Sequence, residues 1–327
     1  NKSDMSLDKI LEFKTVMDKK FGKKNNPIEQ NPENIEVERF STGSIKLDKA
    51  LKGGYAKGTV TEIYGGTGGG KTTLCIHAVA EHQKKYPEEP VMWVDLEKVF
   101  DPVYFKALGV DINPEKFILI NNISKGEDIW ETIISFIKIN NCGIVILDSV
   151  AGLLPAKEDE GEVGDAQMAL AARMNSQGFR KLMPYISFGK ASFIAINQIR
   201  SAIGGYGDPT TTPGGAAWEF YSRTRIKASS SKGEEGEYSK HKFKLIKANY
   251  GHKDRTVETT IEYGVGFNRT KELIEIAIEE NIINKAGSWF SYDGTKLAQG
   301  LDSTVDVLND NLELKDIIEL KIKNDGI

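Results

Sequence analysis

The chain has 327 residues, of which 39% are hydrophobic and 28% charged, and its formal net charge at pH 7 is −4. This length predicts one large domain or two smaller ones with a buried core, and the composition is that of an ordinary globular protein. The acidic balance argues against a protein that binds nucleic acid through bulk positive charge, although it allows a local site. The two cysteines, Cys75 and Cys142, lack a metal-ligand spacing, so we expect both to be reduced. No apolar run is long enough to span a membrane and no signal peptide is visible, so we expect no membrane partner and a cytoplasmic location.

Residues 6–24 carry an apolar stripe at helical spacing, with lysines on the other side of the predicted helix. The stripe includes Leu7, Ile10, Phe13 and Met17. A polar linker with two prolines follows, so the helix is separated from the rest of the chain. Its stripe must be buried either on its own domain or on a neighbouring subunit, and both remain open. We assign residues 1–34 to an N-terminal polymerisation helix and linker.

The stretch Gly65-Gly66-Thr67-Gly68-Gly69-Gly70-Lys71-Thr72-Thr73 contains the phosphate-binding motif G-x-x-x-x-G-K-[ST], which runs from Gly65 to Thr72. Residues 59–64 have the composition of a strand, and the residues from 73 onward have the pattern of a helix. Backbone amides at such a helix N-terminus bind phosphate oxygens, the lysine reaches the β- and γ-phosphates, and the threonine hydroxyl ligates Mg²⁺. The alternative, a flexible glycine loop without a ligand, explains this context poorly. The sequence therefore predicts a nucleoside triphosphate site.

From Ile35 onward, short strands alternate with helices, which predicts a parallel sheet covered by helices. Strands are expected at residues 91–95, 117–120, 143–148 and 192–197, and helices at residues 101–109 and 127–139. Acidic or amide side chains stand at or just after the ends of three of these strands: Glu97, Asp148 and Gln198. Open α/β sheets bind ligands at the carboxyl edge of their strands, so we expect these side chains near the phosphate loop.

Beyond residue 220 the pattern changes to three antiparallel strands, expected at 223–228, 241–248 and 256–263. A composition break near Asn268 opens a last segment with a helix at 272–280 and a final helix near 303–322. The predicted fold class is therefore α/β: a core at residues 35–267 with a mixed, largely parallel sheet, an N-terminal helix, and a small C-terminal α+β domain at residues 268–327.

Several motifs occur in order along the chain: Lys71-Thr72-Thr73-Leu74, Asp101-Pro102-x-Tyr104, Leu147-Asp148-Ser149-Val150-Ala151, Asn197-Gln198-Ile199-Arg200 and Gly287-x-Trp289-x-Ser291-Tyr292. Together they resemble the motifs of the bacterial RecA recombinases. The resemblance runs from about residue 6 to about residue 300 and keeps the order and spacing of the motifs, as in a divergent member of the family. It implies a RecA-like P-loop ATPase core that uses ATP and Mg²⁺. It also implies a homo-oligomeric helical filament on single-stranded DNA, which pairs with double-stranded DNA and catalyses strand exchange in recombination and repair.

The resemblance also assigns the nucleotide residues. The stretch from Gly65 to Thr73 would bind the phosphates, with Thr72 and Asp148 at the metal. Glu97 would be the base that orients the attacking water, assisted by Lys71 and by Gln198 at the γ-phosphate. Asp101 and Tyr104 would hold the adenine, and Lys247 would reach the ATP of a neighbouring subunit.

Two segments, residues 158–168 and 199–215, resemble the DNA-contacting loops of the family. The residues expected at DNA are Met168, Arg173, Ser176, Arg180, Arg200, Ile203, Thr211, Thr212, Gly214 and Gly215. The loops carry no net positive charge, so ordinary surface connections remain the alternative. Backbone amides and hydroxyls nevertheless bind DNA phosphates, and apolar side chains such as Met168 and Ile203 insert between bases.

The chain departs from the family pattern at several positions. The phosphate loop is richer in glycine, which raises the entropy lost on ordering it. Asn249 and Glu219 stand where lysines are usual, so contacts between subunits are weaker or rearranged, and Pro213 displaces a threonine in a shortened second loop. A DNA-dependent ATPase of the hexameric helicase type is the alternative function, and a nucleotide-switched scaffold without DNA is a third.

Overall fold

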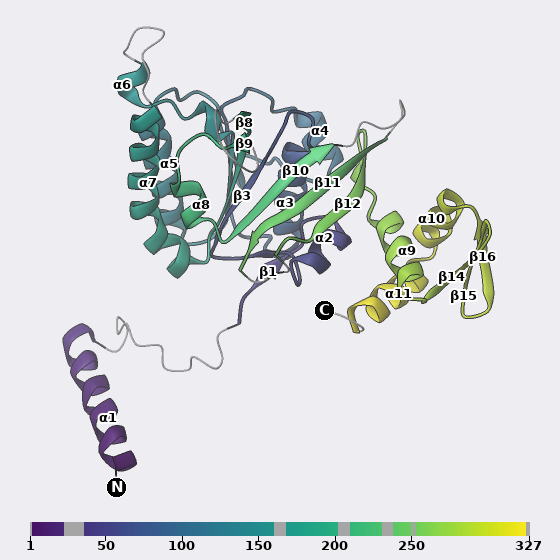
Figure 1. The fold of residues 1–327 in the computed structure, drawn as a ribbon, viewed down its shortest axis with the longest axis horizontal. Coiled ribbons are helices and arrows are strands. Elements are labelled where there is room, and N and C mark those ends of the chain that lie inside the picture. The colour runs from purple at the N-terminus through teal and green to yellow at the C-terminus, as the bar shows by residue number, and fades with distance from the viewer. Residues whose placement is uncertain are drawn as a thin grey trace. The chain divides into compact units, whose positions relative to one another are not determined.

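A computed structural model describes residues 2–22, 36–159, 168–201, 210–230, 238–249, 251 and 253–324 of the chain. The chain divides into two compact units, Asn1–Glu38 and Arg39–Ile327, and each is described by itself. The first unit contains one helix, α1, at Lys2–Phe21 (Figure 1). The predicted N-terminal helix is therefore present, although it begins earlier and ends three residues sooner than expected. Ile10, Leu11 and Phe13 are each more than half exposed along it.

The centre of the second unit is a nine-stranded sheet with the order β13-β12-β11-β10-β3-β7-β6-β4-β5 (Figure 1). Its parallel strands are β3 (Val60–Gly65), β4 (Val91–Asp95), β5 (Phe117–Ile120), β6 (Ile144–Asp148), β7 (Ser192–Gln198) and β10 (Thr224–Ser230). The antiparallel strands are β11 (Tyr238–Ala248), β12 (Thr256–Glu262) and β13 (Gly266–Phe267). The predicted mixed, largely parallel sheet is confirmed.

Helices cover both faces of this sheet because its buried strands are apolar on both sides. One face packs against α2 (Ile45–Ala50), α3 (Lys71–Lys85) and α4 (Pro102–Ala107), and the other against α5 (Gly126–Asn140), α7 (Met168–Gly189) and α8 (Ala217–Tyr221). Alternate residues of β6 show the division: Ile144 and Ile146 join the cluster under α3, whereas Val145 and Leu147 join the cluster under α5.

Shorter elements complete the core. They are β1 (Arg39–Phe40), β2 (Tyr55–Ala56), a 3₁₀ turn at Val150–Gly152, α6 (Ala156–Asp159), β8 (Arg200–Ser201) and β9 (Thr210–Thr211). Strands β8 and β9 pair with each other at the two ends of the second predicted DNA loop.

The C-terminal segment has its own apolar core. It consists of α9 (Arg269–Glu279), the antiparallel strands β14 (Ile283–Ala286), β15 (Trp289–Tyr292) and β16 (Thr295–Gln299), then α10 (Leu301–Asp310) and α11 (Leu312–Asn324). The single helix predicted near 303–322 is wrong, because the chain forms two helices there. Asn311 ends α10, and its side-chain oxygen accepts a hydrogen bond from the amide of Leu314 at 3.1 Å, which caps the start of α11.

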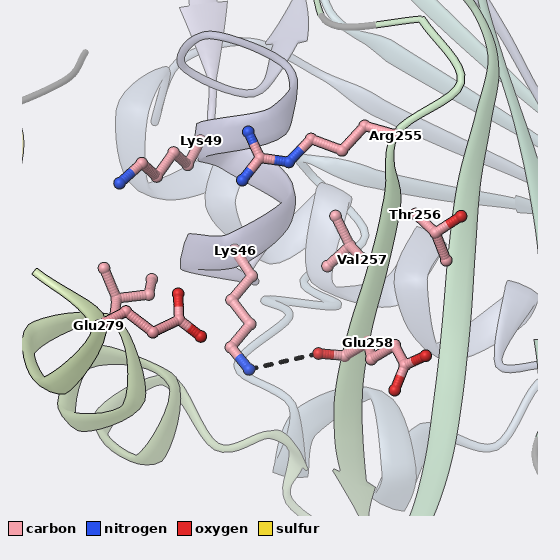
Figure 2. A pocket seen from close by; sticks show the side chains of 8 residues that line it. Lys46, Lys49, Arg255, Thr256, Val257, Glu258 and Glu279 are labelled. Atoms are coloured by element: carbon pink, nitrogen blue, oxygen red, sulfur yellow. Dashed lines mark hydrogen bonds between the residues drawn. The ribbon is translucent and has the colours of Figure 1, made fainter.

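A buried carboxylate joins α9 to α2. Ser44 caps α2 by accepting from the amide of Leu47, and its hydroxyl donates to Glu272 Oε1 at 2.9 Å. Thr259 of β12 donates to the same oxygen. Figure 2 shows the adjoining pocket, of about 270 Å³, where the Lys46 ammonium donates to the backbone carbonyl of Glu258. Since Glu272 is buried and hydrogen-bonded from two elements, it fixes the C-terminal segment to the core.

His77 of α3 makes a similar link to β13. The ring is buried, and its Nε2 accepts a hydrogen bond from the amide of Phe267 at 3.0 Å, so this nitrogen carries no proton. Burial lowers the pKa of His77 to about 4, and the charge of Lys84 adds to the effect. The imidazole is therefore neutral at physiological pH.

We predict that this histidine makes the folded state sensitive to acid. Since its folded pKa lies below the unfolded value near 6.5, the unfolded chain binds the extra proton first. The contribution is complete above pH 6.5 and is lost as the pH falls toward 4, by roughly 3 kcal/mol. Urea unfolding between pH 7.5 and pH 4 measures it. His77→Gln, which keeps an acceptor, should reduce the pH slope by about one proton; an unchanged slope would contradict the assignment.

Candidate functional site

The predicted phosphate loop connects β3 to α3, as the motif requires. Gly70 has a left-handed backbone (φ 83°), and a Cβ there would approach Ile261 Cδ1 to 2.7 Å, so only glycine fits without rearrangement. No side chain caps the amino end of α3. Its first amide groups, with the positive end of the helix dipole, are therefore available to an anionic ligand such as phosphate.

Lys71, at the start of α3, folds back over the loop. Its ammonium donates to the carbonyls of Gly65 at 3.1 Å and Gly66 at 2.6 Å. Partial burial lowers its pKa, while the carboxylates of Asp148 and Glu97 oppose that shift. The lysine is thus the cation of the loop and faces two strand-end acids.

Thr72 and Asp148, the predicted metal residues, lie together. The Thr72 hydroxyl donates to Asp148 Oδ2 at 3.1 Å. Burial, together with the nearby charge of Glu97, raises the pKa of Asp148 to about 7. A hydroxyl and a carboxylate are oxygen ligands of the kind Mg²⁺ uses, and this ion characteristically keeps waters and shares substrate phosphates. The two side chains therefore fit a metal whose other ligands come from water and a nucleotide.

Glu97 and Gln198 also meet, as expected for residues at the same edge of the sheet, although β6 separates their strands. The Gln198 amide donates to Glu97 Oε1 at 2.8 Å, and the Ser149 hydroxyl donates to the same oxygen. Strands β4, β6 and β7 are adjacent in the sheet, which brings residues from three distant parts of the sequence to one edge. The carboxylate of Glu97 is consequently held by the residue that leads into the second predicted DNA loop.

A cavity of about 300 Å³ extends from the phosphate loop toward the predicted adenine residue Tyr104. The Tyr104 hydroxyl lies 2.9 Å from Thr73 Oγ1. Asp101, the other residue predicted there, lies outside the residues that line this cavity, and its carboxylate accepts from the amide of Val103 at 2.8 Å and so caps α4.

Sequence reasoning missed the opposite wall of this cavity. The wall consists of Ser239, His241, Ile261 and Tyr263. These residues belong to or follow β11 and β12, which reach the loop only because β11 pairs with β10 and β10 with β3. In the sequence, the tyrosine at position 263 is the one signal that could have indicated this wall, because tyrosine rings stack on flat ligands. In the structure this ring is 72% exposed and so is accessible to a ligand.

The remaining predicted nucleotide residue, Lys247, lies away from its own phosphate loop. Its ammonium donates to the carbonyls of Glu219 at 2.9 Å and Phe220 at 3.3 Å, at the carboxyl end of α8. Lys247 pairs with Arg225 in the β10–β11 ladder, and Arg225 pairs with Glu62 of β3. Within one chain, Lys247 is therefore not brought to the phosphates.

A buried polar network connects this region to the second predicted DNA loop. Glu62 accepts from Arg225 Nε at 2.6 Å and from Asn197 Nδ2 at 2.8 Å. Asn197 also donates to the carbonyl of Pro213 at 3.0 Å. The network therefore ties β3, β7 and β10 to the carboxyl end of the loop.

The predicted DNA residues of α7 share one face of that helix. Arg173, Ser176 and Arg180 are spaced three and four residues apart, and both arginines are exposed. A buried amide of the same helix, Asn175, donates to the carbonyl of Gly214 at 2.9 Å. The close approach explains the glycine, because a Cβ on Gly214 would lie 2.7 Å from Trp218 Nε1.

The other predicted DNA residues are placed only in part. Arg200 is exposed in β8, Thr212 is half-buried, and Gly215 packs against Ala172 of α7. Ile203 and most of the segment 158–168 lie outside the described residues, as do the side chains of Met168 and Thr211.

Comparison with known proteins agrees with this geometry. The family model for the RecA N-terminal domain matches residues 8–268, and that for the RecA C-terminal domain matches residues 271–325. The chain belongs to the RecA family. The curated Protein RecA of Staphylococcus carnosus is 37% identical over 329 residues, which cover 99% of this chain and 90% of that protein. Protein RecA of Staphylococcus aureus is 38% identical over 331 residues, covering 99% of this chain and 92% of the relative.

Membership establishes the broad activity. The chain is an ATP-dependent DNA recombinase and a DNA-dependent ATPase, and the hexameric helicase alternative is not favoured. Within the described part of the chain, no helix is both long enough and apolar enough to cross a bilayer.

We predict that Tyr263 contributes to nucleotide affinity as the wall opposite Tyr104. Tyr263→Ala should weaken the binding of a fluorescent ATP analogue about fivefold or more, because an aromatic stack contributes about 1 kcal/mol beyond the area it buries. The ring is exposed, so the fold should not change. Val265→Ala, which shortens an exposed neighbour outside the cavity lining, is the matched control. Equal affinities of the Tyr263 variant and the wild type would exclude this role.

Proposed function

We propose that this recombinase binds ATP with Mg²⁺ at the loop from Gly65 to Thr73, and that Gln198 links hydrolysis there to DNA. The bond between Gln198 and Glu97 is the observation that supports the link most directly. It connects the proposed base to the first residues of a DNA loop through a single side chain.

At the phosphates, Lys71 would exchange the carbonyls of Gly65 and Gly66 for phosphate oxygens, which are stronger acceptors because they are charged. Thr72 and Asp148 would hold Mg²⁺, which when bound supplies charge neutralisation for the triphosphate. Tyr104 lines the cavity and would contact the base, and Asp101, three residues before it, would assist from outside the cavity lining. These roles are proposals that agree with the described contacts.

Glu97 would act as the general base, and Gln198 would control it. Gln198 and Ser149 both donate to Oε1 of Glu97 and so orient its carboxylate. A γ-phosphate oxygen is an alternative acceptor for the Gln198 amide. Transfer of the amide to that oxygen would remove one of the two donors from Glu97 and move the first residues of the loop that begins at Ile199, as in nucleotide-dependent ordering of a segment.

For DNA, the exposed face of α7 supplies charge through Arg173 and Arg180, with Ser176 between them. Arg200, Thr212 and the backbone of Gly214 and Gly215 would bind phosphates from the second loop, together with Thr211 and, in the undescribed parts, Met168 and Ile203. The carboxyl end of this loop is fixed by Asn175 and Asn197, so nucleotide and DNA contacts share rigid supports.

Assembly into a helical filament would use α1, which forms a compact unit of its own and exposes Ile10, Leu11 and Phe13. We infer that it packs on a second copy of the chain. The edge strand β5 is a suitable acceptor, since Ile118 is 39% exposed and Ile139 of α5 is 80% exposed beside a pocket of about 490 Å³. Head-to-tail contacts of this kind produce filaments. The cytoplasmic location stays a prediction.

Electron microscopy with ATP and single-stranded DNA tests the proposal. Helical filaments are expected for the wild type, whereas closed rings would favour a helicase and dispersed particles a scaffold.

Lys71→Ala should remain folded but lose DNA-dependent ATP hydrolysis, because the lysine acts on the ligand. A chain that begins at residue 34 should remain dispersed in the same images. Filaments of the truncated chain would show that assembly does not need α1, and would indicate that this helix packs on its own domain instead.

A second prediction concerns the Gln198 switch. In the wild type, a non-hydrolysable ATP analogue should tighten single-strand binding, and DNA should tighten the analogue by the same factor, because linkage is reciprocal. In Gln198→Ala that factor should fall toward one, while binding of the analogue through Lys71 and Thr72 persists. Fluorescence anisotropy measures both affinities. Gln83→Ala, which removes an amide on the outer part of α3, is the control. Full coupling in the Gln198 variant would place the switch elsewhere.

A further inference from the structure

The described part of one chain supplies a single cationic side chain to the phosphate site, in addition to the Mg²⁺ proposed there. Among the described residues that line the cavity, Lys71 is the only cationic side chain. The charges of two carboxylates, Asp148 and Glu97, raise the pKa of Lys71 and so oppose the lowering by burial. Phosphoryl transfer requires stabilisation of the negative charge on the γ-phosphoryl oxygens, and related ATPases and GTPases obtain part of it from a positively charged side chain supplied by the same chain or by a partner. A further cation, supplied by another part of the assembly, would add to this stabilisation.

A candidate group of cations lies on one face of strands β10 and β11. Arg225 and Lys247 are opposite each other in the ladder. The amide of Asn249 donates to the carbonyl of Arg223 at 3.2 Å, so Arg223 and Asn249 are also opposite each other. Residues directly opposite and two apart share a face of a sheet. Arg223, Arg225 and Lys247 therefore belong to one face, and the uncharged Asn249 is the fourth member.

Two of these three cations have no carboxylate partner among the described residues. Arg225 is held by Glu62 at 2.6 Å and lies 3.4 Å from Glu219. Lys247 instead donates to two backbone carbonyls, and Arg223 is exposed without a side-chain partner in the described part of the chain. The pKa of Lys247 is lowered mainly by burial and further by the charges of Arg225 and Arg223, so the Arg223 guanidinium lies near the ammonium.

Arg223 cannot serve the phosphate loop of its own chain. Its amide donates to the carbonyl of Val60, at the amino end of β3. The loop begins at Gly65, five residues further, which corresponds to about 16 Å of strand at 3.3 Å per residue. This separation exceeds the reach of an arginine side chain. A nucleotide contact by Arg223 must therefore be made to another subunit.

The surroundings of Arg223 have the character of a protein interface. Phe220, at the end of α8, is 75% exposed, and its carbonyl accepts from the Lys247 ammonium. Arginine and aromatic side chains are enriched among the residues that dominate binding at interfaces. An exposed aromatic ring beside two unpaired cations fits a neighbouring subunit that presents an anionic site.

We propose that Arg223 contacts the triphosphate bound at the phosphate loop of the adjacent subunit, beside Lys247 and Phe220. The inference rests on the proposed filament and adds Arg223 as a catalytic residue that acts between subunits. Its planar guanidinium donates two parallel hydrogen bonds to phosphate oxygens, a geometry that a lysine at the same place does not provide.

The test compares Arg223→Ala with Arg255→Ala, an exposed arginine outside this group (Figure 2). DNA-dependent ATP hydrolysis should fall by about 10²-fold or more in Arg223→Ala. This loss is smaller than that expected when an arginine is the only added cation at the γ-phosphate, because Lys247 remains in the variant. Affinity of the unassembled chain for an ATP analogue, affinity for single-stranded DNA, and filament formation should stay at wild-type values. Arg255→Ala should hydrolyse ATP at the wild-type rate.

A mixing experiment shows whether the residue acts between subunits. Glu97→Gln keeps Arg223 but lacks the base, so equimolar mixed filaments with Arg223→Ala should recover about a quarter of the wild-type rate, since one site in four then has both groups. No recovery on mixing, or an unchanged rate in Arg223→Ala alone, would overturn the proposal. Weaker DNA binding with normal hydrolysis at saturating DNA would identify Arg223 as a DNA contact instead. If the wild type itself forms no filaments, the proposed function fails, and this is visible before any variant is compared.

Discussion

The carboxylate of Glu62 is fully buried in the middle of the sheet, and the arrangement around it determines much of the molecule. A buried charge is strongly destabilising unless it is paired and hydrogen-bonded. Here Arg225 and Asn197 supply the partners, from the strands on either side of β3. The strand that leads to the phosphates is thereby fixed laterally to the strand that ends at Gln198 and to the strand that begins beside Arg223. Removing Arg225 would leave the carboxylate without its counter-charge, and removing Asn197 would leave one of its oxygens without this donor, so either change would loosen the strands that it joins.

The distribution of charge follows from the same sheet. Acidic and amide side chains gather at the carboxyl ends of β4, β6 and β7, where they can order water and metal around a phosphate. Arg223 and Lys247, which have no carboxylate partner among the described residues, lie near the opposite end of β3. In the proposed assembly, one chain would therefore carry the two halves of a phosphate site at separate places. Association of chains would then let each half compensate the charge of the other.

The local parts of this architecture could be predicted from the sequence. The phosphate loop has a fixed spacing, and buried parallel strands such as Val91–Asp95 have an unbroken apolar composition, so both were located almost to the residue. Their acidic ends were expected at one edge because parallel strands end together. The bond between Gln198 and Glu97 could not be foreseen in detail, since it depends on strand order and rotamers. Ser239, His241 and Tyr263 were missed because their positions depend on pairing between strands that are distant in sequence. The two helices near the carboxyl end were merged because Asn311 gives a weaker break than glycine or proline.

The position of Arg223 and Lys247 at one end of the strands, with the phosphate loop at the other, would give the proposed assembly a direction. In a head-to-tail array, each nucleotide is completed by the subunit on one side only. The subunit at one terminus then has no donor, and its ATP remains in place. Turnover consequently scales with the number of junctions rather than with the number of subunits, so a short array hydrolyses less ATP per chain than a long one. The terminal nucleotide would mark one end of the array chemically, although every chain in it has the same sequence.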